Sequence, residues 1–543
     1  MKKLLDAKIL FLLGLLLCIP VIIPYFHSGY FPTHDGLWAV VRAGEMFREI
    51  RDHQFPPRYS SVLNYGYGYP LFNFTYPFPY YLATILHLFK FGFISSIKTI
   101  FLLSVVFSYA GMFLLVKKQY KSTLIAFLAG LLYIYLPYRM VDLYVRGSIG
   151  ESVSFAIYPF LLLTSLMVLE NKKQGFSFLL TPLLVTSLVL AHNISAVYFG
   201  IIFLVLFIFG LATKNKNARY LLGSFVWGGF LSAFFLVPAL FEKNNILLSV
   251  IPIADRALYY VSLPQLLFSP WGYGTPTDKT PFTYQAGFGQ ILGFLTSLVF
   301  LIKQKHFLKP EFFLSVLVVV FLFMLFPASF FLWKLPLLSE INYPWTLLLP
   351  LGFLMCFLSA FFVKQVKYGV PLLGVFVFIS IAFTFNYAKP EKYLYYPDSY
   401  YLTNEATTTS SQELMPLWVK KMPVSRFDNK VEAKGNADNL KYNSKNITFT
   451  LNSDAPQNVI VNQIYYPGWK AYVNGSEVKV NFKNEKGIMQ ISILPGNNTV
   501  HLRFTETPLR LASDIVSAIS FIILLASIAR FAYAFYYGKK RKK

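Results

Sequence analysis

Residues 99–138 read TIFLLSVVFSYAGMFLLVKKQYKSTLIAFLAGLLYIYLPY. Two apolar runs, 99–116 and 122–138, flank the basic turn 117–121. A helix that crosses a membrane needs about 20 mostly apolar residues, and Lys and Arg near its ends are retained on the cytoplasmic side. The stretch therefore predicts two neighbouring membrane helices joined by a short cytoplasmic turn.

Apolar runs of this kind recur through the chain and are separated by short basic clusters. Their length and composition predict a polytopic α-helical membrane protein with about 12 spans. The predicted spans are 8–25, 99–116, 122–138, 152–169, 176–191, 194–213, 220–241, 283–302, 311–328, 343–362, 368–386 and 511–537.

The basic residues also predict the orientation. Lys2 and Lys3 precede the first span and the basic tail 538–543 follows the last, so both termini are expected in the cytoplasm and the number of spans is even. Counting the run 76–94 as a further span would move Lys117 to the outside. This run is therefore predicted to be an interfacial or re-entrant helix.

The composition excludes several classes of protein. Apolar residues make up 55% of the 543 residues and charged residues 14%, whereas a soluble domain carries about 25% charged residues. The mean hydropathy is +0.51. These values exclude a soluble multidomain enzyme and a disordered protein. The net charge of +24 lies largely in short turns between apolar runs rather than along a soluble face, which argues against nucleic-acid binding.

Three parts are predicted. Residues 1–386 form a transmembrane domain with a long first external loop, 26–98. Residues 387–510, where apolar runs vanish, form an external domain, and residues 511–543 form the last span with its basic tail. Long aromatic and charged loops fall on the external side, so we expect the chemistry outside a multi-pass protein of the plasma (cytoplasmic) membrane.

The external domain is predicted to be a β-sandwich. Apolar and polar residues alternate from residue 428, with Ile447, Phe449 and Leu451 on one strand face. Asn474-Gly475 suits a type I′ hairpin turn, which requires positive φ angles. About six to eight short strands with tight turns are typical of such sandwiches. The aromatic run 465–469 suits either sugar binding or a packed core.

The densest polar chemistry follows the first span. His34 and Asp35 precede the segment 37–52, which is predicted to be an amphipathic helix on the membrane surface. A carboxylate there suits a general base or a ligand of a hard divalent cation. It suits an N-cap equally well. Tyr67, in the Gly- and Tyr-rich run 64–70, offers a hydroxyl and a ring to a substrate.

A second polar cluster follows the span 122–138. Arg139, Asp142, Arg146 and Glu151 border apolar helices, where ionisable groups are costly and pair internally or bind a ligand. Arginine suits a bidentate phosphate contact, and Glu151 is a candidate second metal ligand. Internal Arg–Asp and Arg–Glu pairing is the alternative interpretation.

Two further residues are candidates for substrate contact. His192 lies between spans 176–191 and 194–213, where a packing histidine is the competing interpretation. Trp271 lies in the aromatic loop 268–274, which suits the wall of a sugar or lipid pocket.

This arrangement resembles the GT-C superfamily of membrane glycosyltransferases. Members share an acidic residue just after the first span, matched here by Asp35, and a second acidic loop after the third span, matched by Asp142 or Glu151. The resemblance implies a GT-C-like helical domain with its active site on the external face.

A closer resemblance is to bacterial membrane proteins described as 6-pyruvoyl-tetrahydropterin synthase-related and as YfhO-like. The runs 54–58, 66–70 and 142–151 are similar to the former. The run 465–471, with the Asn-Gly turn and the final span that follow, is similar to the carboxyl end of the latter. Pterin synthases hold zinc with several histidines, and the sequence has no such cluster.

The resemblance implies inverting transfer of a sugar from a polyprenyl-phosphate carrier to a glycan, lipid or protein acceptor, at the surface of the lipid bilayer. Asp35 would deprotonate or orient the acceptor with help from His34, and Glu151 together with Asp142 would position the acceptor or a metal. The residues implied to hold the leaving phosphate are Arg58, Arg139 and Arg146. A divalent cation, Mg²⁺ or Mn²⁺, bound by Asp35 and Glu151 is left open.

The chain departs from this pattern in two places. Thr346 stands where relatives tend to carry arginine, and the first loop has a single acid at position 35 instead of a pair, which leaves metal dependence open. Two other classes of function are alternatives to a transferase. A lipid or polymer transporter predicts buried charges in mid-span, and a non-catalytic scaffold predicts a β-domain that binds a partner or a cell-envelope polymer.

Overall fold

The computed structural model describes residues 7–170, 175–275, 277, 281–403, 406–409 and 411–540. Lys2, Lys3 and the tail residues 541–543, on which the predicted orientation rests, lie outside the described residues. The α-helices are α1 (Ala7–Leu17), α2 (Ile19–Ile22), α3 (Gly36–Arg51), α4 (Leu71–Phe74), α5 (Phe78–Leu88), α6 (Phe93–Tyr120), α7 (Thr123–Ile134), α8 (Pro137–Val141), α9 (Ile149–Glu170), α10 (Phe176–Ala191), α11 (Asn193–Ala212), α12 (Ala218–Leu231), α13 (Ala233–Phe241), α14 (Leu263–Leu267), α15 (Phe288–Lys303), α16 (Pro310–Met324), α17 (Leu348–Leu358), α18 (Gly369–Thr384), α19 (Asp398–Leu402) and α20 (Pro508–Lys540).

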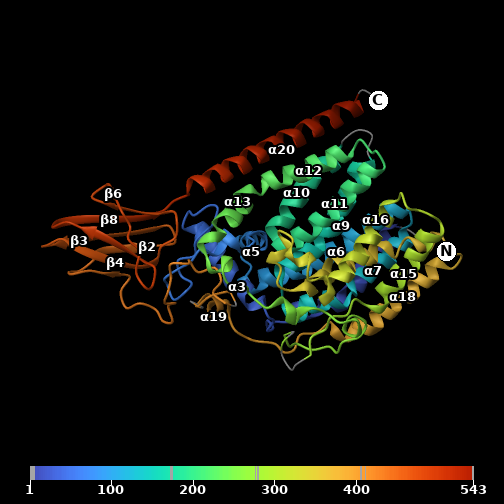
Figure 1. Ribbon diagram of the computed structural model, residues 1–543, viewed down its shortest axis with the longest axis horizontal. Coiled ribbons are helices and arrows are strands. Elements are labelled where there is room, and N and C mark those ends of the chain that lie inside the picture. Colours follow the sequence, from blue (N-terminus) through green and yellow to red (C-terminus); the bar gives the residue numbers. More distant parts are fainter. Residues whose placement is uncertain are drawn as a thin grey trace.

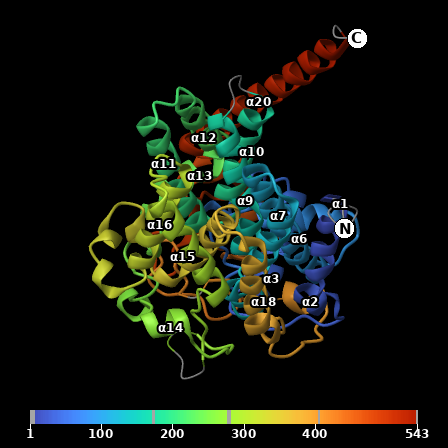
Figure 2. The ribbon, with the colours of Figure 1, turned by 90° about the vertical axis from the view of Figure 1, so that its right-hand side faces the viewer.

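The long helices run side by side in one bundle, and the β-domain projects from one end of it (Figure 1). The start of α1 and the far end of α20 lie away from the β-domain (Figure 1). Figure 2 turns the molecule by 90° and shows α20 extending beside α10 and α12. The β-domain is therefore attached to the bundle at both of its chain ends, through the segment that precedes it and through α20.

Seven helices of the described chain are long and apolar enough to cross a membrane, or up to nine if each of two bent pairs forms one span. The bent pairs are α7 with 137–146, at 49°, and α12 with 233–245, at 74°. Three shorter apolar helices, α10, α15 and α16, coincide with other predicted spans. The protein is a multi-pass helical membrane protein, and the count of 12 spans stays a prediction.

The β-domain contains two antiparallel sheets, with strand orders β1-β4-β7 and β2-β3-β8-β5-β6. Ile447, Phe449 and Leu451 are buried as predicted, because alternate residues of a strand face the same side. Asn474 and Gly475 have φ angles of 51° and 83° and join β5 to β6 in the predicted hairpin. The strands are β1 (Val431–Glu432), β2 (Asp438–Tyr442), β3 (Asn446–Ser453), β4 (Gln457–Ile464), β5 (Trp469–Val473), β6 (Ser476–Val478), β7 (Ile488–Ile493) and β8 (Gly496–Phe504).

The aromatic run at 465–469 packs inside the protein. Tyr466 and Trp469 are buried, and the Tyr465 ring stacks on Phe482 with centroids 4.1 Å apart. These contacts agree with the packed-core interpretation of the run.

Helix α3 agrees with the predicted helix 37–52, but two of its carboxylates differ from the expectation of a solvated face. Glu45 and Glu49 are buried. Ser60 donates a hydrogen bond to Glu45, and Gln54 Nε2 donates one to Glu49 at 2.7 Å. The segment that follows α3 folds back over this face of the helix, so these two carboxylates are covered by protein.

Helix α5 has 11 residues, and at 1.5 Å per residue it is about 16 Å long. This length is too short to cross a bilayer. The run 76–94 therefore does not form a span of its own, in agreement with the interfacial or re-entrant helix that the parity argument predicts.

Candidate active site

Two backbone hydrogen bonds join the first loop to the second polar cluster. The amide of His34 donates to the carbonyl of Val145 at 3.0 Å, and the amide of Asp35 donates to the carbonyl of Arg146 at 2.8 Å. The segment 142–146 is a short π-helix that ends at Gly147, whose φ of +62° lies in the left-handed region. An added Cβ at Gly147 would lie 2.0 Å from Thr33 Oγ1, so the close approach of the two loops needs a glycine there.

Arg146 lies at the centre of the site. Its Nη2 is 3.8 Å from Asp35 Oδ2, and its Nη1 forms an ion pair with Glu151. Nη1 also lies 3.2 Å from the hydroxyl of Tyr138, and the guanidinium carbon lies 4.6 Å from the ring centroid of Trp345. A guanidinium stacked on an indole and held by a carboxylate is fixed in direction and presents its remaining N–H groups toward Asp35.

Asp35 is the most accessible member of this set, because 37% of its side chain is exposed, against 12% for Arg146 and 2% for Glu151. Asp35 stands at the N-cap position of α3, but its side chain makes no capping hydrogen bond. Thr33 Oγ1 accepts the amide of Gly36 at 3.0 Å instead. The carboxylate is therefore available for chemistry rather than used as a helix cap.

Both oxygens of the Glu151 carboxylate contact protein groups. Oε1 pairs with Arg146 and lies 4.0 Å from His192 Nε2, while Oε2 accepts the hydroxyl of Tyr138 at 2.7 Å. Arg146 thus occupies the position between Asp35 and Glu151 that a bridging cation would take. Among the described residues no group of three or more His, Cys, Asp or Glu could hold a metal ion. The donor set does not fit a divalent cation shared by these two carboxylates.

His192 lies next to this carboxylate. Its Nδ1 accepts the amide of Ser195 at 3.3 Å, and its ring lies edge-on to Tyr76 with centroids 5.4 Å apart. Burial lowers the pKa of His192 to about 4, and the nearby Glu151 carboxylate opposes that shift. The imidazole is therefore neutral near pH 7, and with Nδ1 as the acceptor its Nε2–H faces Glu151.

Arg139 and Asp142 form an internal pair, as the alternative interpretation of this cluster predicts. Arg139 Nη1 lies 3.4 Å from Asp142 Oδ2, both side chains are fully buried, and Arg139 Nη2 donates to Ser104 at 2.6 Å. The Arg139 guanidinium also lies 4.6 Å from the ring centroid of Phe155. The pair holds α8 against α6 and α9 and presents neither group to Asp35.

Arg58 and Tyr67 lie at the joint with the β-domain and the last helix. Arg58 donates to Asp514 at 2.8 Å and to the carbonyl of Phe234 at 2.6 Å. Tyr67 accepts the side-chain amide of Gln463 at its carbonyl oxygen, at 2.8 Å. Because its buried guanidinium is engaged by protein acceptors, Arg58 is no longer a candidate for holding the leaving phosphate.

His34 and Trp271 lie in the loops beside the site. His34 Nε2 is 3.4 Å from the carbonyl oxygen of Tyr273, and Trp271 stacks on Tyr387 with centroids 4.4 Å apart. They form part of a wall of aromatic loops beside the site.

Sequence reasoning missed the residues that orient the charges, namely Tyr138, Trp345 and Tyr76. Trp345 is next to Thr346, whose hydroxyl is taken up by hydrogen bonds to Tyr198 and to the carbonyl of Tyr343, each at 2.7 Å. Aromatic residues at the ends of two distant spans were the available signal, but nothing in their spacing shows that they meet Arg146.

Two known families of membrane proteins match this chain. The model of the family described as "6-pyruvoyl-tetrahydropterin synthase related domain; membrane protein" matches residues 72–389, more than half of the chain. The protein therefore belongs to this family of membrane proteins. The model described as "Bacterial membrane protein YfhO" matches residues 405–516, so both resemblances predicted from the sequence are confirmed. No curated protein matches the chain.

Several solved structures resemble part of this chain. The apo oligosaccharyltransferase of Archaeoglobus fulgidus is 15% identical over 73% of this chain and 56% of its own, with a TM-score of 0.45. The same archaeal enzyme in complex with an inhibitory peptide and a dolichol-phosphate is 13% identical over 73% and 56%, at 0.42. The arabinofuranosyltransferase AftD from Mycobacteria is 13% identical over 70% and 27%, at 0.44. The chain thus spans about half or less of these proteins, and at such TM-scores the likeness says nothing of its activity.

Proposed function

We propose that this protein is a membrane glycosyltransferase that moves a sugar from a polyprenyl-phosphate donor to a hydroxyl of an acceptor on the external face. One observation carries the proposal. The accessible carboxylate of Asp35 faces, at 3.8 Å, a guanidinium that is itself fixed by a buried carboxylate and an indole ring. A base beside a held cation is what transfer from a phosphate leaving group requires.

Asp35 acts as the general base. The acceptor O–H gives its proton to Asp35 while its oxygen forms a bond to the anomeric carbon of the donor sugar. The bond between that carbon and the phosphate oxygen breaks, and its electron pair leaves with the polyprenyl phosphate. Attack opposite the leaving phosphate inverts the configuration at the anomeric carbon.

Arg146 stabilises the charge that develops on the departing phosphate. Its planar guanidinium suits a phosphate, and most of its side chain is shielded from water, which strengthens the interaction. Glu151 and Tyr138 act as positioning residues for this guanidinium. Because both oxygens of Glu151 already contact Arg146 or Tyr138, Glu151 itself is a poor candidate for the general base.

The test is transfer by the full-length protein reconstituted in liposomes. Polyprenyl-phosphate donors carrying radiolabelled glucose, mannose, N-acetylglucosamine or arabinose are supplied together with a cell-envelope extract as the acceptor. Release of polyprenyl phosphate and labelling of the extract are measured for the unmodified protein and for D35N.

We expect D35N to lower the rate of transfer by about 100-fold to 10,000-fold, which is the usual contribution of a general base. The control is D454N, because Asp454 is an exposed acid in the β-domain, and it should transfer at the rate of the unmodified protein. Full activity of D35N, or no consumption of any donor by the unmodified protein, overturns the proposal.

A further inference from the structure

Asp35 stands at the N-cap of α3, and one face of this helix lies along a groove. Leu37, Val41, Gly44, Arg48 and Arg51 are spaced three or four residues apart and so share one face of the helix. Two cavities lie along this face. One, of about 430 Å³, includes Leu37 and Val41 in its lining, and the other, of about 370 Å³, includes Gly44, Arg48 and Arg51.

Helix α19 crosses α3 between the two cavities. The Leu402 side chain packs on Gly44 so closely that an added Cβ would lie 2.1 Å from its Cδ2. Tyr400 and Tyr401 of α19 line the first cavity, and Asp398 and Leu402 line the second. The two cavities are therefore neighbouring halves of one groove, which α19 narrows at its middle.

The half at the N-terminal end of α3 is aromatic. Trp38, Tyr400 and Tyr401 line it, and 54% of Tyr400 is exposed. The hydroxyl of Tyr401 is buried and has no hydrogen-bond partner within the described chain. Trp and Tyr combine a flat apolar face with a polar tip, which suits the alternating C–H faces and hydroxyls of a sugar ring.

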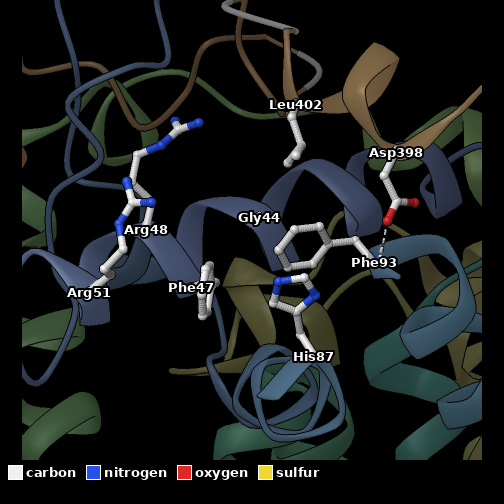
Figure 3. Close-up of a pocket in the computed structure, with 8 residues that line it drawn as sticks. All are labelled: Gly44, Phe47, Arg48, Arg51, His87, Phe93, Asp398 and Leu402. Atoms are coloured by element: carbon white, nitrogen blue, oxygen red, sulfur yellow. Dashed lines mark hydrogen bonds between the residues drawn. The ribbon is translucent and has the colours of Figure 1, made fainter. Parts of the chain in front are cut away.

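The far half is basic. Figure 3 shows Arg48 and Arg51 together at one side of the cavity, while Phe47, His87 and Phe93 lie between them and α19. Arg51 is exposed and makes no recorded hydrogen bond or ion pair in the described residues. Arg48 forms an ion pair with the buried carboxylate of Glu45, so Arg51 supplies the available positive charge of this half. Asp398 does not offset that charge, because its carboxylate accepts the amides of Phe93 and Ile94 at 2.6 and 3.1 Å.

We propose that this groove along α3 binds an acidic saccharide and delivers its end to Asp35 as the acceptor. The inference rests on the proposed function and names its acceptor class. Sixteen helical residues extend about 24 Å, enough for several sugar units. The rings of the near half stack on sugar faces, and Arg51 of the far half pairs with a carboxylate or phosphate group on the saccharide.

A phospholipid headgroup fits the groove less well. The exposed apolar side chains of this region that suit a bilayer are Leu88 and Phe89, which are 67% and 74% exposed, and neither of them lines either cavity. A lipid at this surface would therefore lie beside α5, while the groove offers ring faces and cations.

The experiment measures binding of fluorescent tetragalacturonic acid to the full-length protein in phosphatidylcholine nanodiscs, with maltotetraose as the uncharged probe. We expect tetragalacturonic acid to bind more tightly than maltotetraose. R51Q and W38A should each weaken its binding about 10-fold, since one charge-assisted contact or one stacked ring is lost. W38F should retain most of the affinity, and R503Q, at an exposed arginine of β8, should bind as the unmodified protein does.

Equal binding of tetragalacturonic acid by all variants, or no binding by the unmodified protein, overturns the inference. So does a result in which R51Q binds tetragalacturonic acid as the unmodified protein does and loses only its binding to phosphatidylglycerol vesicles, because the groove would then be a lipid site.

The two proposals fail separately. If D35N loses transfer while the groove variants bind and transfer normally, the acceptor groove is wrong and the transferase stands. If no protein transfers sugar but binding is lost only in the groove variants, the transferase is wrong and the saccharide groove stands.

Discussion

Arg510, near the start of the last helix, donates two hydrogen bonds to Oε2 of Glu242, from Nε at 3.1 Å and from Nη2 at 2.7 Å. The same carboxylate accepts Asn73 of the first loop at 2.8 Å and Thr507 at 3.2 Å. The Tyr466 ring lies 5.2 Å from the guanidinium. One buried ion pair therefore joins the first loop, the helical bundle, the β-domain and α20, and holds in place the loop that carries Asp35.

We expect E242Q to destabilise the protein by about 3–5 kcal/mol, because it leaves the buried charge of Arg510 without its partner. The measurement is the shift of the unfolding midpoint in detergent. The matched control is E340Q, which breaks the neighbouring pair with Lys243. Glu340 is 58% exposed, so its loss should cost at most about 1 kcal/mol. Similar shifts for the two variants would contradict the assigned role of Glu242.

The contact between the β-domain and the first loop should make the stability of the protein depend on pH. Lys430 is buried beneath the first loop and donates to the carbonyl of Gly66 at 2.9 Å and to Gln463 at 2.7 Å. Burial lowers its pKa to about 7, with Arg426 adding to the shift. An unfolded lysine has a pKa of about 10.4, so between these values the unfolded chain binds more protons, and stability should rise with pH.

The check compares the unfolding temperatures of the unmodified protein and K430M from pH 6 to pH 10. The difference between them should be constant below about pH 7 and should change in favour of the unmodified protein above it. K470M, at an exposed lysine of the same domain, is the control. A difference that does not vary with pH, or the same trend in K470M, would show that Lys430 does not titrate in this range.

Much of the fold could be predicted because it follows from local patterns. Alternating residues in β3, the Asn474-Gly475 turn and the apolar runs each depend on neighbours in the chain. The buried face of α3 could not be predicted, since Glu45 is covered by Ser60 and the loop around it. An amphipathic pattern predicts a helix but does not show which other segment of the chain will cover the polar side of that helix.

The candidate site could be predicted only in part, because some of its contacts join residues that are far apart in the sequence. The order of spans places the loops that carry Asp35 and Arg146 on the same side, and the family resemblance implies that Asp35, Arg146 and Glu151 act at one site. Backbone hydrogen bonds at 34–35 join the two loops. Arg58 was grouped with them, yet it pairs with Asp514, more than 450 positions later in the chain. A basic residue in an external loop carries no signal that distinguishes a phosphate ligand from the partner of a distant acid.

Substitutions at Arg146 and Glu151 should affect transfer in different ways. R146K keeps the charge but loses the planar fork and the stack on Trp345, so we expect the kcat of transfer to fall about 10-fold to 1,000-fold. E151Q keeps Arg146 but loosens it, and R146K/E151Q should be little worse than R146K alone, since the two side chains act as a unit.

The control for these variants is E170Q, at the exposed end of the pair with Lys118. Independent effects of R146K and E151Q that multiply in the double variant would contradict the assignment of Glu151 as the residue that positions Arg146.

Removal of divalent cations should leave transfer unchanged. Arg146 lies between the two carboxylates that would otherwise hold a metal, and Glu151 already contacts Arg146 and Tyr138. We expect the rate of transfer in liposomes to be the same after dialysis against EDTA as before, and added Mg²⁺ or Mn²⁺ to have no effect. If EDTA abolishes transfer and either cation restores it, a metal and not Arg146 neutralises the leaving phosphate. In that case R146Q should retain cation-dependent activity. If the Arg146 guanidinium alone neutralises the leaving phosphate, R146Q should be inactive with or without the cation.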